Sequence, residues 1–164
     1  MEDTSIIDAL GDLVVADFLN TKPVTATSDS PMAEIVRMFL EHGFGGIPIV
    51  DNGFLQGMAL KRDLLEIYFI PHHEVDDTEK LMQLVSLMDP SKPVSEFMDP
   101  DSITVAPDCK AARLAQLMLK NDTFIFPVVR EKRLLSFKTK KEFLGIVTLT
   151  DMLPLLYEAI VRED

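Results

Sequence analysis

The sequence has 164 residues, of which 47% are apolar and 26% are charged, and this fits one soluble globular domain or two small domains in contact. Its net charge of −11 disfavours nucleic acid and anionic membranes as partners, because both present phosphate groups to a protein surface. The single cysteine excludes a disulfide framework and a cysteine-cluster metal site. No apolar run approaches the roughly 20 residues of a membrane helix, and the acidic N-terminus has no signal-peptide pattern, so we expect a cytoplasmic protein.

The first half of the chain predicts a leading helical segment and then the order strand, helix, strand, strand, helix. Ser30 and Pro31 indicate the start of the first of these helices, with Ser30 as its cap and Pro31 in its first turn. The apolar residues of this helix recur at helical spacing, at Met32, Ile35, Val36, Phe39 and Leu40. The predicted elements are a leading helix within residues 1–14, strands at 24–26, 47–50 and 54–60, a turn at 51–53, and a closing helix at 63–69.

The second half repeats this order after an insertion at residues 71–93. The insertion has a polar loop and then an amphipathic helix, which contains Leu81, Leu84, Val85 and Met88 and ends at Asp89-Pro90. Asp108 precedes the next helix as its expected cap, and that helix has apolar residues at Ala111, Leu114, Ala115, Met118 and Leu119. The remaining predicted elements are strands at 103–105, 126–129 and 143–149 and a closing helix at 151–161. Pro48 and Pro127 place their strands at a sheet edge or a strand start.

The two halves are copies of one another. A shift of 79 positions aligns residues 15–50 with residues 94–129 without a gap and with eight identities, among them Thr25 with Thr104 and Pro48 with Pro127. Beyond residue 51 the shift becomes 88, which aligns Gly57 with Gly145 and Asp63 with Asp151, so the second copy has nine additional residues. The predicted divisions are a lead-in at 1–14, repeat one at 15–70, the insertion at 71–93, and repeat two at 94–164 with a long basic hairpin at 130–142.

These features resemble a tandem pair of CBS (cystathionine beta-synthase-type) domains, the Bateman module. Both lead-ins are similar to the family's Val-x-x-Phe-Met pattern, as Val15-Ala16-Asp17-Phe18-Leu19 and Val94-Ser95-Glu96-Phe97-Met98. The segment Gly145-Ile146-Val147-Thr148-Leu149-Thr150-Asp151 matches the family's entry into the last helix in full. The resemblance covers about residues 15–161 and includes the whole order of elements twice.

The resemblance implies an α/β (α+β) fold in which two β-α-β-β-α units pack about a pseudo-two-fold axis. It also implies two clefts for adenosine-containing ligands such as AMP, ADP, ATP or S-adenosylmethionine. Modules of this kind usually sense a ligand and regulate a partner, so the resemblance implies a regulatory protein that is not an enzyme and has no cofactor of its own.

Thr148 and Asp151 stand where a strand passes into a helix, and they are the first candidates for ligand binding. The unpaired N–H groups of a helix start favour an anion, the Thr148 hydroxyl can meet a phosphate, and the Asp151 carboxylate can accept both hydrogen bonds of a ribose diol. The alternative is a capping box, in which Thr-x-x-Asp closes the helix start without any ligand.

The corresponding segment of the first copy keeps its aspartate, Asp63, but has Leu60 in place of the threonine. Lys61 and Arg62 stand beside it as candidates to neutralise a phosphate, or as a solvated pair on an acidic protein. We therefore expect the first site to bind nucleotides more weakly than the second.

Thr104 and Phe124 complete the predicted ligand-binding residues of the second copy. Phe124 either stacks on adenine or fills the core, whereas the first copy has the small pair Gly45-Gly46 in this segment, which leaves its backbone accessible to a flat base. Each copy thus has part of a good site, and one occupied site centred on Thr148 and Asp151 is the prediction.

The hairpin at residues 130–142 holds six of the 16 basic residues and only two acidic ones, together with Leu134, Leu135 and Phe137. It can dock an acidic partner, an acidic face of a second copy or a phosphate tail, or it can be an exposed loop whose lysines keep it soluble.

The other reactive residue types give little indication of a functional site. His72-His73 with Glu74, Asp76 and Asp77 has the ligand types of a metal site, but its spacing matches no zinc motif, so we expect no metal. Cys109 lies near a helix start, where a thiol pKa is often lowered, but the adjacent Asp108 opposes that effect.

Two functions compete: a ligand-sensing module that acts on an unknown partner in trans, and a dimeric interaction scaffold that binds no ligand. An enzyme that uses the histidine and acid loop is a remote third. Both closing helices are apolar nearly all round, which predicts a homodimer, or a monomer in which the inserted helix covers the excess. The residues concerned are Leu64, Leu65, Ile67, Tyr68, Phe69 and Ile70 in the first helix and Met152, Leu153, Leu155, Leu156, Tyr157, Ile160 and Val161 in the second.

Overall fold

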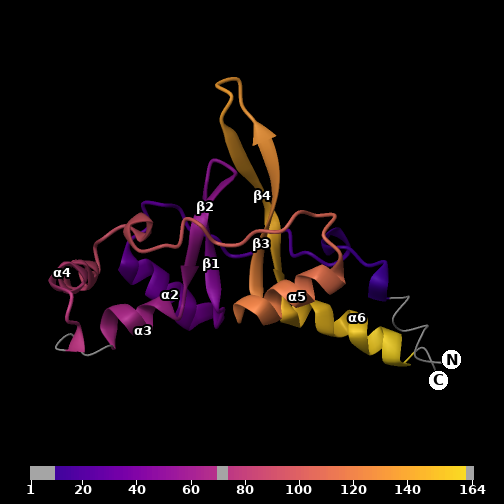
Figure 1. Cartoon of the computed structure of the whole chain (residues 1–164), viewed down its shortest axis with the longest axis horizontal. Helices are drawn as coiled ribbons and strands as arrows, with labels where there is room; N and C mark the ends of the chain where they lie inside the picture. Colours follow the sequence, from indigo (N-terminus) through magenta and orange to yellow (C-terminus); the bar gives the residue numbers. More distant parts are fainter. Residues whose placement is uncertain (1–9, 70–73, 162–164) are drawn as a thin grey trace. The chain divides into compact units, whose positions relative to one another are not determined.

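The computed structural model describes residues 10–69 and 74–161 (Figure 1). The chain forms two compact units, and each consists of helices and an antiparallel strand pair. The first-repeat unit is Val24–Ser102, and the second-repeat unit combines Met1–Pro23 with Ile103–Asp164. The α+β class predicted from the sequence is confirmed. In the described ranges, no helix has the length and apolar content that a bilayer crossing requires.

The first-repeat unit has strands and helices close to their predicted positions. Its elements are α2 (Met32–His42), β1 (Gly46–Asp51), β2 (Phe54–Leu60), α3 (Asp63–Tyr68), α4 (Thr78–Leu87) and the 3-10 helix η3 (Val94–Glu96). Asn52 and Gly53 form the β1–β2 turn with φ angles of 51° and 83°, which asparagine and glycine tolerate best. The predicted hairpin is confirmed.

The second-repeat unit repeats this arrangement with a longer hairpin. Its elements are η1 (Val15–Asp17), α5 (Ala111–Asn121), β3 (Ile125–Arg133), β4 (Thr139–Thr148) and α6 (Leu149–Val161). The last helix begins at residue 149, before the predicted start at residue 151, so Pro154 lies beyond its first turn and removes one helical hydrogen bond. Of the predicted leading helix, residues 10–11 are helical, and residues 5–9 lie outside the described residues.

The prolines of β1 and β3 are explained by the short segment that pairs with each strand. Ala26 forms a parallel bridge with Ile49, and its N–H donates to the Pro48 carbonyl at 3.1 Å. Val105 pairs in the same way with Val128 and donates to Pro127 at 3.1 Å. Because only one residue of each segment is paired, the missing proline N–H leaves no ladder bond unmade.

Each unit contains the lead-in of the other repeat. Residues 14–20 lie in the second-repeat unit, where Asn20 and Ile146 exchange backbone hydrogen bonds of 2.9 and 3.0 Å. The lead-in of repeat two lies in the first-repeat unit, where Asp99 and Met58 make the equivalent pair at 2.8 and 3.0 Å. The compact units therefore differ from the sequence repeats by an exchange of their leading segments.

This exchange requires the glycines that the two repeats share. A Cβ atom at Gly145 would lie 2.2 Å from the Asn20 carbonyl oxygen, and one at Gly57 would lie 2.5 Å from the Asp99 carbonyl oxygen. Both distances are far inside van der Waals contact with backbone, which cannot move away cheaply. Glycine at these positions therefore permits the close approach of the lead-in.

The residues just before the exchanged lead-ins satisfy the first N–H group of the first helix of each unit. The Met32 N–H donates to the Lys92 carbonyl at 2.8 Å, and the Ala111 N–H donates to the Leu13 carbonyl at 2.9 Å. The predicted side-chain caps, Ser30 and Asp108, are wrong, since neither α2 nor α5 has a side-chain cap. Backbone carbonyls from a distant segment satisfy these N–H groups instead.

The core of each unit consists of the buried faces of its helix and strands together with the exchanged lead-in. Buried residues of the first-repeat unit include Ile35, Met38, Phe39, Ile47, Ile49, Ala59 and Val94. Buried residues of the second-repeat unit are Val15, Val105, Leu114, Met118, Phe126, Val128 and Val147. Leu40 and Leu119 continue the helical apolar spacing noted in the sequence, but they are 82% and 78% exposed. They lie at the edge of the apolar stripe, on the side of the helix away from the strands.

Candidate functional site

The junction of β4 with α6 is the best-ordered candidate site of the second-repeat unit. Asp151 Oδ2 accepts hydrogen bonds from the Thr148 backbone N–H at 2.7 Å and from the Thr148 hydroxyl at 2.8 Å. The Asp151 N–H donates in return to Thr148 Oγ1 at 3.3 Å. These bonds form a capping box, which was one of the two interpretations of this motif. Both bonds to the carboxylate use Oδ2, so among the hydrogen bonds of the described residues Oδ1 is left available to a ligand donor.

Phe124 lies at the same junction. Its carbonyl accepts a hydrogen bond from Leu149 N, the first residue of α6, at 3.1 Å, and Ile125 next to it pairs with Thr148. The side chain of Phe124 is 44% exposed, so it is not a core residue. The structure therefore places the backbone of an exposed aromatic residue beside the helix start that holds the Thr148 hydroxyl and the Asp151 carboxylate.

Thr104 belongs to the same unit but takes no part in the hydrogen bonds found at the β4–α6 junction. It is half-buried and directly precedes Val105, whose bridge to Val128 fixes the extended segment. The hydrogen bonds found at the junction link Thr148, Leu149 and Asp151 to one another and to Phe124, and none includes Thr104.

The junction of β2 with α3 in the first-repeat unit has a similar backbone, although α3 begins two aligned positions later than α6, and its side-chain chemistry differs. The Lys61 N–H donates to the Gly45 carbonyl at 2.9 Å, which matches the bond between Leu149 and Phe124. Asp63 accepts a backbone hydrogen bond from Leu60, but Leu60 has no hydroxyl to complete the box. Burial raises the pKa of Asp63 above its usual range, and the Arg62 guanidinium opposes this shift. This carboxylate is consequently less well satisfied than that of Asp151.

Lys61 and Arg62 were predicted to neutralise a phosphate. Both are exposed; Arg62 Nε lies 4.0 Å from Asp63 Oδ1, and Lys61 Nζ lies 5.9 Å from the centroid of the Phe39 ring. Neither residue lines the pocket that contains Asp63.

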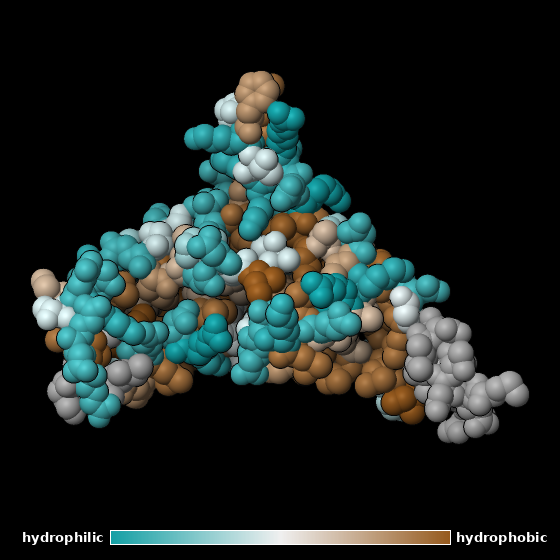
Figure 2. Space-filling model, in the orientation of Figure 1, coloured by the Kyte–Doolittle hydropathy of each residue, from teal (hydrophilic) through white to brown (hydrophobic). Residues whose placement is uncertain are grey.

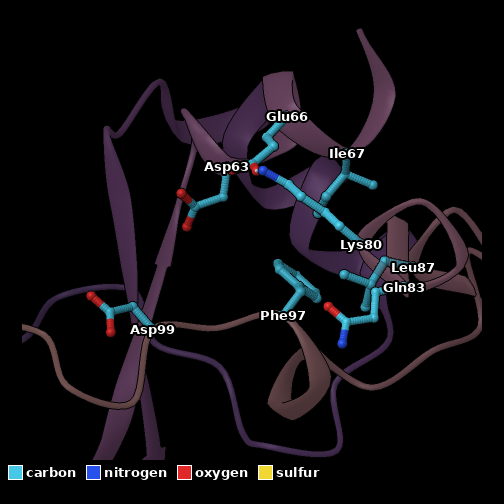
Figure 3. A pocket seen from close by; sticks show the side chains of 8 residues that line it. All are labelled: Asp63, Glu66, Ile67, Lys80, Gln83, Leu87, Phe97 and Asp99. Carbon is cyan, nitrogen blue, oxygen red and sulfur yellow. The ribbon is translucent and has the colours of Figure 1, made fainter. Parts of the chain in front are cut away.

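That pocket has a volume of about 300 Å³ and is built from α3, the inserted helix α4 and the segment after η3 (Figure 3). Its lining residues are Asp63, Glu66, Ile67, Lys80, Gln83, Leu87, Phe97 and Asp99. The ammonium of Lys80 lies 3.0 Å from Glu66 Oε1, and Figure 3 shows this side chain reaching from α4 toward α3. Three carboxylates and one already paired cation make the pocket unfavourable for a phosphate group.

Sequence reasoning missed the pocket residues contributed by α4 and by the second lead-in. Lys80 and Gln83 belong to an insertion that the repeat alignment leaves out, and Asp99 belongs to a lead-in assigned to the other repeat. The alignment does contain a signal for Asp99, because it pairs this residue with Asn20, which contacts β4 in the same way.

Other predicted reactive groups have no site around them. His72 and His73 lie outside the described residues, and in residues 10–69 and 74–161 no three metal-ligating side chains are placed so that they could hold a metal ion. Burial raises the pKa of the Cys109 thiol, with Asp108 adding to the rise and Arg113 opposing it. This agrees with the expectation that Cys109 is not an activated nucleophile.

The CBS domain profile matches residues 15–69 and 94–158. The chain therefore belongs to the CBS domain family and contains a tandem CBS pair. It is 25% identical to the CBS domain-containing protein YhcV of Bacillus subtilis over 138 residues. The aligned region covers 84% of this chain and 81% of that protein. It spans only 46% and 37% of two uncharacterised relatives from Methanocaldococcus jannaschii, MJ1225 and MJ0188, which are 24% and 22% identical.

Two solved structures of similar fold contain adenosyl ligands. The CBS domain pair of MJ0100, in complex with 5′-methylthioadenosine and S-adenosyl-L-methionine, has a TM-score of 0.61 and 24% identity, with 89% of this chain and 97% of that chain covered. CBSX2 in complex with AMP has a TM-score of 0.65 and 19% identity, with coverage of 92% and 98%. At these identities the likeness establishes the fold.

Proposed function

We propose that this chain is a regulatory module that binds an adenosine-containing ligand at the β4–α6 junction and acts on a partner in trans. The observation that carries the proposal is the arrangement of Phe124, Thr148 and Asp151 at one helix start. Oδ1 of Asp151 accepts the hydrogen bonds of a ribose diol, and Phe124 stacks on the adenine ring. Adenosyl ligands in structures of the same fold support this assignment.

The function we propose is binding and not catalysis. The Thr148 hydroxyl and the Asp151 carboxylate bond to one another as a helix cap, so both groups already have a structural role at this junction. We place the module in a reducing cytoplasm, which suits its single cysteine.

The first-repeat unit is the weaker nucleotide site in this proposal. The carboxylates of Asp63, Glu66 and Asp99 repel a phosphate chain, so an adenosyl compound without phosphate is the better fit there. A crystal soaked in AMP should show the nucleotide at the β4–α6 junction, and density only beside Asp63 would contradict this ranking.

Isothermal titration of the whole chain with AMP, ADP, ATP and S-adenosylmethionine tests the ligand assignment. A ligand at 100 times its dissociation constant should also stabilise the fold by about 2.7 kcal/mol in a thermal melt. Phe124→Ala should weaken binding by about 5- to 100-fold, because base stacking contributes roughly 1–3 kcal/mol. Phe44→Ala is the matched control, since Phe44 is 36% exposed and belongs to the first-repeat unit. Equal affinity for both variants and the parent chain would reject the site.

A second function, a dimeric scaffold, is favoured by the exposed face of α6. This helix has no buried residue, and Leu153, Leu156, Tyr157 and Ile160 are 52%, 42%, 68% and 54% exposed. The α3 helix differs, because Ile67 is buried against Met32, and Val75 and Leu87 from the insertion pack beside it. We propose that α6 is the main contact of a homodimer, because monomers rarely expose so much apolar surface. Of the residues predicted for this contact, Ile70 lies outside the described residues.

Equilibrium sedimentation tests the dimer. We expect a mass of twice the 18.4 kDa chain at micromolar concentration, and Tyr157→Glu should yield monomers because it places an unpaired charge in the contact. Leu135→Glu is the control, since it adds the same charge at a fully exposed hairpin position. A parent chain that sediments as a monomer would rule out this contact.

A further inference from the structure

We propose that the end of the β3–β4 hairpin docks on the surface of an anionic phospholipid bilayer. The hairpin extends beyond the helices of its own unit (Figure 1), and it corresponds to nothing in the first repeat, whose strands are joined by a tight turn. The proposal is independent of the ligand site. It departs from the expectation drawn from the net charge, because charge is distributed very unevenly along this chain.

Cations concentrate at the outer half of the hairpin. At its root, Arg130 lies opposite Glu142 and Glu131 lies opposite Lys141, so each acidic residue faces a basic one. Beyond the root, the charged residues of the hairpin are all cations, and Lys132 lies opposite Lys140. These cations are Lys132, Arg133, Lys138 and Lys140. A cluster of this kind favours an anionic surface outside the chain.

The loop that closes the hairpin presents apolar side chains to solvent. Leu135 is fully exposed and Phe137 is 80% exposed. The Leu134 N–H donates to the Lys138 carbonyl at 2.9 Å, and the Phe137 N–H donates to the Leu134 carbonyl at 3.0 Å, so the loop has a defined conformation. Figure 2 shows the resulting order, with an apolar end above a hydrophilic stalk.

Phe137 adopts a backbone conformation that a bulky residue rarely takes. Its φ angle is 61°, in the left-handed region where glycine or asparagine is favoured. The Arg133 guanidinium lies 5.3 Å from the centroid of its ring, which holds the aromatic side chain in place. A strained and exposed aromatic residue indicates a function for the side chain, because packing does not require it.

The order of these groups along the hairpin matches the depth profile of a bilayer. Lys132 and Lys138 lie one or two residues behind the apolar loop, roughly 3–7 Å along the strand. The headgroup layer of one leaflet is about 5–8 Å thick, so the loop reaches the acyl chains when the cations lie at the phosphates. A single-stranded nucleic acid would instead need aromatic residues along a groove, and the apolar residues here lie only at the end.

The acidic remainder of the chain does not prevent this contact. The hairpin's six cations and two anions leave a net charge of −15 on all other residues, since the total is −11. Leu134 at the loop lies five positions beyond Val129 in the core, a span of about 16 Å. The Debye length at physiological ionic strength is about 8 Å, so most of the repulsion from the body is screened.

Vesicle flotation with the full chain tests the proposal at ~0.15 M salt. Vesicles of phosphatidylcholine mixed with phosphatidylglycerol should carry the protein, and vesicles of phosphatidylcholine alone should not. Lys132→Gln with Lys138→Gln should lower partitioning about 25-fold, because each basic residue near the surface contributes about 5-fold. Lys22→Gln with Lys120→Gln is the matched control, since it changes the net charge equally at exposed positions outside the hairpin. This control should float like the parent chain.

The apolar loop needs its own variant. Phe137→Asn should lower partitioning about 10-fold, and asparagine suits the left-handed backbone, so the hairpin should keep its fold. Met82→Asn, at a position 70% exposed on α4, is the control for a lost surface hydrophobe. Thermal melts check that each variant is folded. The proposal is overturned if the parent chain does not float with the anionic vesicles. It is also overturned if the hairpin variants float to the same extent as the parent chain. Tighter binding to single-stranded DNA or polyglutamate, unaffected by Phe137→Asn, also overturns it and assigns the hairpin to polyanions in general.

Discussion

The two strand–helix junctions have nearly the same backbone and differ in how their aspartates are satisfied. Asp151 accepts two hydrogen bonds from Thr148 and closes the start of α6. Asp63 has a leucine in place of that threonine, and burial raises its pKa. One hydroxyl group therefore decides whether the carboxylate serves as a cap or remains under-satisfied beside a pocket. The repeated aspartate alone does not show which role it has.

The largest loss of stability is expected from a change to the backbone beside the two junctions. Gly145→Ala should lower the free energy of unfolding by about 3–4 kcal/mol, because overpacking against the Asn20 carbonyl adds to strain at its φ of 155°. Gly57→Ala should cost less, about 2–3 kcal/mol, since its nearest approach is longer. Chemical denaturation measures both.

Gly45→Ala is the control for these glycines, because nothing lies within 4 Å of a Cβ atom there and its φ is not positive. It should change the free energy of unfolding by less than about 0.5 kcal/mol. If Gly145→Ala were equally mild, the lead-in would not lie against β4 as described.

Replacing each aspartate in turn should change the free energy of unfolding in opposite directions at the two junctions. Asp151→Asn should destabilise the fold by about 1–2 kcal/mol, since a neutral amide is a poorer acceptor for the Thr148 bonds. Asp63→Asn should stabilise it at neutral pH, because it removes a charge that burial disfavours.

The pH dependence separates this gain at Asp63 from a packing effect. A carboxyl whose folded pKa is raised binds its proton more tightly when folded, so its ionisation lowers stability as pH rises from 3.8 through the folded pKa. The advantage of Asp63→Asn should therefore be present at neutral pH and disappear below pH 3.8. An advantage that is constant across this range would assign the effect to packing.

Most of the fold could be predicted because the same pattern of elements occurs twice in the sequence. Helical spacing, the Asp51-Asn52-Gly53 turn and the repeated order of elements each indicated the same architecture. The exchange of lead-ins could not be predicted, since hydrogen bonds such as that from Met32 to Lys92 join segments far apart in the chain. For the same reason Ser30 was mistaken for a helix cap.

The candidate site was predictable only in part. Thr148 and Asp151 do bond to one another, and the Phe124 carbonyl bonds to Leu149 beside them; their positions in the repeat were the signal. The pocket beside Asp63 was not foreseen, because Lys80 and Gln83 lie in an insertion with no counterpart in the other repeat. Local periodicity places such a helix but does not indicate which surface it covers.

The smallest change in stability is expected from a substitution in the β3–β4 loop, which can be compared with the β1–β2 turn. Asn52 has a φ of 51° in the β1–β2 turn, and Phe137 has a φ of 61° in the longer β3–β4 loop. Asparagine tolerates this region and phenylalanine does not, so Phe137→Asn should relieve roughly 1 kcal/mol of strain. It also removes the contact between Arg133 and the ring, which at an exposed site is worth about 0.5 kcal/mol. The net result should be a stabilisation of about 0.5 kcal/mol, or roughly 1–2 °C in Tm. Differential scanning calorimetry on Phe137→Asn alone and with Arg133→Gln separates the two contributions. A loss of stability in the single variant would mean that the ring supports the fold, and that its exposure does not indicate an external partner.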